Sequence, residues 1–137
     1  MYRQTHDQYL EHEVMSSDPV KLVRILYRAA IEAVSSARAH LRAGAIRERS
    51  RQVTRALRIV HELLHSLDME TGGDVATSLA RLYAYMTRRL IEGNTRQADA
   101  PLEEVERLLQ TLLEAWTSIA TAPPLEPEPY EPVSCSY

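Results

Sequence analysis

The feature that most constrains the fold is the Gly72-Gly73 pair, because it lies between two long stretches whose apolar residues recur at helical spacing. Glycine adopts positive φ without steric cost, so a pair of glycines favours a turn. Asp74 follows and suits a helix N-cap, since its carboxylate can accept hydrogen bonds from the free N–H groups of the first turn. We therefore expect one helix to end near Leu67, another to begin near Asp74, and the two to fold back as an antiparallel hairpin.

Glycine and proline also mark the ends of the other expected helices. Asp18-Pro19 predicts a helix start, because a capping carboxylate precedes proline at the first helical position. Gly44 and Gly93-Asn94 predict two helix ends, and residues 98–101 predict a restart. Short turns make sequential helices antiparallel, so the sequence predicts an all-α, up-down-up-down four-helix bundle. The expected helices cover about residues 19–42, 46–67, 75–92 and 101–122.

The chain divides into three expected segments. Residues 1–16 form an N-terminal cap segment that we expect to lie across the bundle, because Tyr9 and Val14 are too apolar to remain in water. The four-helix bundle covers residues 17–122. Residues 123–137 hold five of the seven prolines and three glutamates, so this acidic tail is expected to be extended or disordered.

Charge and cysteine content exclude several classes of partner and location. The net charge is −3, which makes nucleic acid an unfavourable partner. Cys135 is the only cysteine and cannot form an intrachain disulfide, which fits a reducing compartment. The N-terminus has no apolar run typical of a signal peptide, and no stretch approaches the roughly 20 apolar residues of a bilayer span. We expect a cytoplasmic protein without direct membrane insertion.

One short motif suggests catalysis. His61-Glu62-Leu63-Leu64-His65 fits the HExxH pattern of zinc-dependent hydrolases, with two imidazoles one turn apart and a glutamate as general base. No third ligand follows at the expected spacing, and the second Glu-x-x-His of a di-iron bundle is missing. We expect the two histidines to flank an ordinary apolar stripe. The zinc hydrolase is the less favoured alternative, and we predict no enzyme activity, no cofactor and no metal.

Apolar surface is the remaining candidate for function. The apolar residues of 19–42 cover an arc of about 200° around the helix, and those of 75–92 cover about 180°. A surface helix of a globular domain needs an apolar arc of only about 100°. Residues 46–67 instead carry one ordinary stripe, with arginines on the opposite, solvated face. The excess apolar surface would suit either a scaffolding homodimer or a groove that receives a partner helix.

Four segments in order resemble the flagellin-specific secretion chaperones, the FliS family. Residues 26–31 (LYRAAI) resemble that family's Leu-Tyr-x-Gly-Ala-Ile segment, and residues 14–19 (VMSSDP) resemble the stretch before it. The block 67–90, with Gly-Gly-Asp-Val-Ala and Leu-Tyr-Ala-Tyr-Met, and the block 104–116, which ends in Glu-Ala-Trp, are similar to its later helices. The resemblance covers about residues 7–120, although Ala29 replaces a usual glycine and Ser78 a usual asparagine.

The resemblance implies an antiparallel four-helix bundle that binds the disordered C-terminal segment of flagellin in the cytoplasm. It further implies that the chaperone prevents premature polymerisation and hands its client to an export-gate protein of the flagellar type III apparatus. The free protein could pair as a homodimer. We predict a displaceable cover made of three N-terminal residues, and client grooves or adjoining core made of eight others. The cover residues are Tyr9, Leu10 and Val14; the others are Val20, Tyr27, Ile31, Val34, Leu82, Met86, Leu108 and Leu112.

Overall fold

The computed structural model describes residues 19–121, with side chains to residue 119, and consists of four α-helices. They are α2 (Pro19–Arg42), α3 (Ile46–His65), α4 (Met69–Arg96) and α5 (Asp99–Thr121). The predicted all-α four-helix bundle is confirmed. The Asp18 cap, the N-terminal cap segment and the acidic tail lie outside the described residues.

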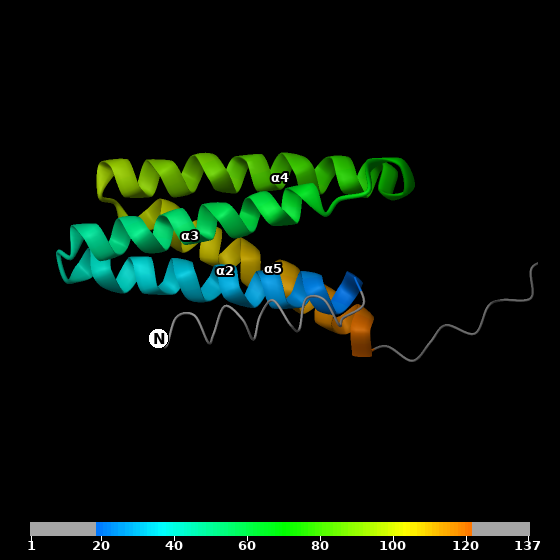
Figure 1. Ribbon diagram of the computed structural model, residues 1–137, viewed down its shortest axis with the longest axis horizontal. Coiled ribbons are helices and arrows are strands. Elements are labelled where there is room, and N and C mark those ends of the chain that lie inside the picture. The colour runs from blue at the N-terminus through cyan, green and yellow to red at the C-terminus, as the bar shows by residue number, and fades with distance from the viewer. Residues whose placement is uncertain (1–18, 122–137) are drawn as a thin grey trace, which may run out of the picture.

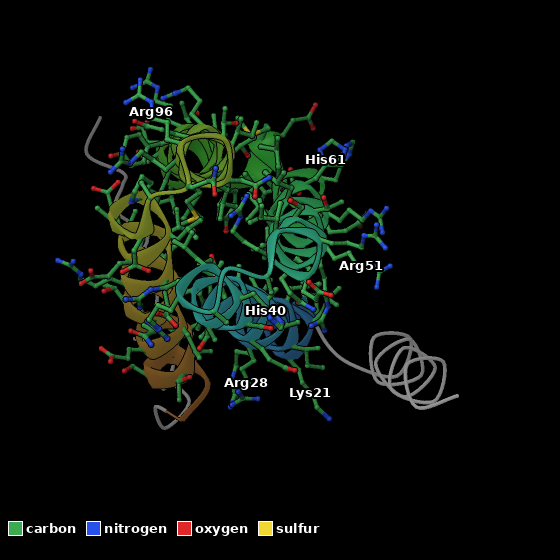
Figure 2. All side chains as sticks on the ribbon, turned by 90° about the vertical axis from the view of Figure 1, so that its left-hand side faces the viewer. Lys21, Arg28, His40, Arg51, His61 and Arg96 are labelled. Carbon is green, nitrogen blue, oxygen red and sulfur yellow. The ribbon has the colours of Figure 1, made fainter. Side chains whose placement is uncertain are left out.

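The helices form a ring in which each one packs on two neighbours. α2 packs on α3 and α5, and α4 packs on the same two helices, whereas the backbones of diagonal pairs do not come close within the described part. The end-on view of Figure 2 shows this order around the bundle. In Figure 1, α2, α3 and α4 run along the long axis while α5 crosses obliquely and diverges from α4 toward its C-terminal end.

The core fills the centre of this ring. Its fully buried side chains come from all four helices, and the largest are Tyr27, Tyr83, Leu63, Met86, Leu90, Leu102 and Leu109. Burial of one such side chain typically stabilises a fold by about 1.5–3 kcal/mol. The wide apolar arc of α2 has a structural reason: it faces α3 on one side and α5 on the other. Much of the apolar surface that we expected to exceed the needs of the core is therefore buried in the core.

The turn between α3 and α4 differs in detail from the prediction. The capping side chain is Asp68, whose carboxylate accepts hydrogen bonds from the Glu70 and Thr71 N–H groups, so Asp74 was the wrong choice. α4 begins at Met69 and is interrupted at Gly73, which has φ 51° and ψ −126°. Because this conformation is essentially restricted to glycine, the predicted break is present but lies inside the first turns of α4.

Gly93 does not end its helix, so that prediction was wrong. α4 continues to Arg96 and ends at Gln97 in the left-handed conformation, with the Ala98 N–H donating to the Gly93 carbonyl at 3.0 Å. Gly93 is buried, and a Cβ there would lie 2.8 Å from side-chain atoms of Leu102 on α5. The missing side chain therefore permits a close approach of two helices.

Three residues of the predicted apolar stripes face solvent instead. Val75 is 68% exposed, Ile119 is 61% exposed and Leu64 is 38% exposed. Val75 lies two residues after the interruption at Gly73, and Ile119 lies in the last turn of α5. Periodicity alone misassigned them because the bundle does not cover these positions near the helix ends.

Candidate functional site

A groove open to solvent runs between α2 and α5 and has a volume of about 540 Å³. Ile31 from α2 and Leu113 from α5 supply its large apolar side chains. Charged and polar groups surround them, so the groove combines an apolar strip with a hydrogen-bonding rim. Its lining residues are Arg28, Ile31, Glu32, Ser35, Ser36, Ala39, Glu106, Gln110 and Leu113.

An ion-pair cluster fixes α5 against α2 at one end of this groove. The Arg38 guanidinium donates to both Asp99 carboxylate oxygens at 2.8 and 3.0 Å and to Glu106 at 2.5 Å. The hydrogen bond from Arg38 is the main cause that lowers the pKa of the Asp99 carboxyl below its usual value. Glu106 both lines the groove and accepts from Arg38, so this cluster positions part of the groove wall.

A second polar cluster joins α4 to α5. The Tyr85 hydroxyl donates to the Glu104 carboxylate at 2.5 Å, and Arg89 donates to the same oxygen at 2.8 Å. These bonds lower the pKa of Glu104, with the tyrosine contributing most. Arg89 also pairs with Glu92 on its own helix at 2.8 Å. The N-terminal half of α5 is thus tied to both neighbouring helices.

A buried hydrogen-bond chain lies beneath the C-terminal half of α5. The Tyr27 and Tyr83 hydroxyls are 2.5 Å apart, and the Trp116 indole N–H donates to Tyr27 at 3.3 Å. The chain joins α2, α4 and α5 across the centre of the ring. Burial raises the pKa of both tyrosines, so they stay neutral donors and acceptors at ordinary pH.

The predicted site residues fall into three groups. Tyr9, Leu10 and Val14 lie outside the described residues. Tyr27, Val34 and Met86 are completely buried in the core. The half-buried residues are Val20, Ile31, Leu82, Leu108 and Leu112, and all except Val20 pack against the core. Only Ile31 also lines the α2–α5 groove, and α5 carries Leu113 beside it.

Sequence reasoning missed the polar rim of the groove. Arg28, Glu32, Glu106 and Gln110 lie on two helices that are far apart in the sequence, so periodicity could not place them together. The available signal was weaker: Arg28 and Glu32 are one turn apart, as are Glu106 and Gln110, and both pairs flank an apolar stripe. Figure 2 shows Arg28 projecting from the outer side of α2.

The HExxH motif lies elsewhere, on the exposed side of α3. His61 and His65 are both exposed, as Figure 2 shows for His61, and their Nε2 atoms are 3.0 Å apart. Within residues 19–121, no group of three or more histidine, cysteine, aspartate or glutamate side chains could hold a metal ion. The structure gives the zinc hydrolase alternative no third ligand in this range. None of the helices described is both long and apolar enough to cross a bilayer.

Comparison with known proteins identifies the family to which the chain belongs. Residues 1–123 match the family described as "Flagellar protein FliS". The chain is 38% identical over 112 residues to the "Flagellar secretion chaperone FliS" of Salmonella typhimurium, which covers 81% of this chain and 83% of that protein. It is 33% identical over 111 residues to FliSB of Pseudomonas aeruginosa, covering 81% and 88%, and 24% identical over 108 residues to FliS of Bacillus subtilis, covering 79% and 80%. The chain belongs to the FliS family of flagellar secretion chaperones.

Proposed function

We propose that this protein is a cytoplasmic export chaperone, without enzyme activity, that binds the disordered C-terminal segment of flagellin. Binding prevents premature polymerisation, and the complex is delivered to an export-gate protein of the flagellar type III apparatus. Membership of a family whose relatives are named secretion chaperones supports a secreted client. The observation that carries the proposal is the groove between α2 and α5.

The composition of the groove suits an amphipathic segment. Ile31 and Leu113 offer an apolar strip to client side chains spaced one helical turn apart. Arg28, Glu32 and Gln110 can form hydrogen bonds with the polar side of the same client. Because a disordered client loses conformational entropy when it folds on the chaperone, affinity stays moderate for the area buried, and release at the export gate is possible.

Half-buried apolar residues on α4 and α5 extend the proposed client surface. Leu82, Leu108 and Leu112 pack against the core but are only partly buried within one copy. Tyr27, Val34 and Met86 support this surface from the core. In this proposal Tyr9, Leu10 and Val14 cover part of it until the client arrives. Deletion of residues 1–15 should therefore speed client binding, and an unchanged rate and unchanged stability would contradict a cover.

Paired isoleucine substitutions test the groove. Ile31→Glu places a charge in the apolar strip and should weaken binding of a flagellin C-terminal fragment by about tenfold or more. Ile91→Glu is the matched control, because Ile91 is 49% exposed on α4 and does not line the groove. Calorimetric titration of the full chain measures both affinities. Equal affinity of the two variants would show that the client does not use this groove.

A second pair tests the groove without altering a residue that packs on the core. Ser35 is exposed and lines the groove, so Ser35→Trp should obstruct it. Thr54→Trp adds the same side chain to an exposed position on α3, outside the groove. We expect Ser35→Trp alone to lower the affinity for the client. If both variants bind the fragment as the wild type does, the groove assignment is wrong.

The scaffolding homodimer is the competing function. It predicts that the half-buried surface meets a second copy and stays covered when flagellin is added. Light scattering with and without the flagellin fragment distinguishes the two functions. A chaperone forms a mixed complex at the expense of any self-paired species, whereas a scaffold keeps its mass.

A further inference from the structure

The two histidines of α3 form a surface feature that the proposed chaperone function does not use. His61 and His65 lie one helical turn apart and are both exposed. They lie on a helix that contributes no residue to the α2–α5 groove. Their Nε2 atoms approach to 3.0 Å and the two rings meet at an interplanar angle of 70°.

The ring positions show that the contact between the two Nε2 atoms is bent. Two imidazoles joined by a linear bond between nitrogens 3.0 Å apart would have centroids separated by more than about 5 Å. The centroids are only 4.4 Å apart. The two rings are therefore inclined to each other, and their Nε2 atoms do not face each other along a straight line.

The distance between the two Nε2 atoms fits two adjacent ligands of a transition-metal ion. At metal–nitrogen distances of about 2.0–2.1 Å, nitrogens at 90° to each other lie about 2.9 Å apart, whereas a tetrahedral angle would separate them by about 3.4 Å. The observed 3.0 Å is closer to the first value. Square-planar and octahedral coordination by imidazole is typical of Cu²⁺ and Ni²⁺, and Cu²⁺ binds most strongly among the divalent first-row ions.

We propose that His61 and His65 form a two-imidazole binding site for a divalent transition-metal ion, with Cu²⁺ preferred over Ni²⁺ and Zn²⁺. Water molecules occupy the remaining coordination positions. The ion links two successive turns near the C-terminal end of α3, so binding also stabilises the folded helix. Among the described residues no third protein ligand accompanies the pair.

Titration of the full chain with Cu²⁺ or Ni²⁺ tests the site, with His61→Ala, His65→Ala and His40→Ala compared under identical conditions. His40 is half-buried on α2 and lies outside the pair. Because the second imidazole binds within a chelate, loss of either His61 or His65 should weaken Cu²⁺ binding by about tenfold or more. His40→Ala should bind as the wild type does.

A register control separates chelation from histidine content. Glu62→His combined with His65→Gln keeps two exposed histidines on α3 but places them on adjacent residues, about 100° apart around the helix. Glu62→Gln controls for the lost charge. Electron paramagnetic resonance should show two equatorial nitrogens on Cu²⁺ in the wild type and one in the register variant.

Two results would overturn the site. The first is equal Cu²⁺ affinity of the wild type and the register variant, which would mean that spacing is irrelevant. The second is binding that persists unchanged in His61→Ala and His65→Ala, which would place the ion on other groups. Helical circular dichroism of each variant verifies that these exposed substitutions leave the bundle folded.

Discussion

The hydrogen-bond chain of Tyr27, Tyr83 and Trp116 makes a specific prediction about stability. Tyr27→Phe removes the central hydroxyl, which leaves the buried Tyr83 hydroxyl and the Trp116 indole N–H without this partner. An orphaned buried polar group costs about 1–3 kcal/mol. Trp116 is half-buried and can recruit water more easily than Tyr83. We therefore expect Tyr27→Phe to lower the free energy of unfolding by about 2–3 kcal/mol.

The same substitution at Tyr83 should lower the free energy of unfolding less. Tyr83→Phe removes one bond, but the Tyr27 hydroxyl still accepts from Trp116, so the loss should be about 1 kcal/mol. In the double variant the Tyr83 hydroxyl is absent and only the indole N–H lacks its partner. The double variant should then lose no more unfolding free energy than Tyr27→Phe alone. The sum of the two single losses should therefore exceed the loss in the double variant by about 1 kcal/mol or more.

Urea unfolding of the four proteins provides the assay. Trp116 is the only tryptophan, so its fluorescence reports directly on the network, and circular dichroism reports on the helices. Both signals should give the same midpoint for a two-state domain. Additive losses of stability in the double variant would contradict this prediction, because they would mean that the two hydroxyls do not satisfy each other in the folded protein.

Two further predictions concern the helix contacts of α5. Gly93→Ala should destabilise the bundle by about 1–2 kcal/mol despite the higher helix propensity of alanine, because its Cβ would crowd Leu102. Thermal unfolding should show a smaller loss of stability when Leu102 is also replaced by valine. A Gly93→Ala variant that is more stable than the wild type would contradict close packing. The Arg38–Asp99 pair should contribute about 1 kcal/mol or less. Since folding lowers the pKa of Asp99, this contribution is present above the ordinary carboxyl pKa of about 3.9 and is lost as pH falls through the lower folded value. Urea unfolding at several pH values measures the stability difference between the wild type and Asp99→Asn. This difference should shrink below about pH 4. A difference that grows below this pH would contradict the lowered pKa of Asp99.

Helix number and most boundaries followed from local chemistry. Gly44 separates α2 from α3 as expected, and it adopts the left-handed conformation that favours glycine. The cap was placed at the wrong aspartate. Asp68 caps α4 through the N–H groups of Glu70 and Thr71, whereas Asp74 follows the interruption at Gly73 inside the helix.

Contacts between distant residues could not be predicted from periodicity. Gly93 looked like a helix end, but its role depends on Leu102 in the next helix. Tyr27 and Tyr83 each occupy an apolar stripe, and nothing in the sequence indicates that their hydroxyls meet across the ring. The arc of α2 was correctly recognised as wide, yet its width reflects packing on two helices as well as the open groove. Fully buried Tyr27 and half-buried Ile31 belong to the same predicted set, because spacing alone does not distinguish core from groove.

The most direct test of the central claim is a titration of the full chain with a fragment comprising the C-terminal segment of flagellin, with molecular mass and helical circular dichroism recorded together. We expect a mixed complex of one chaperone and one fragment, with more helix than the sum of the separate components, since the client folds in the groove. An unchanged mass distribution and additive spectra at all fragment concentrations would contradict it.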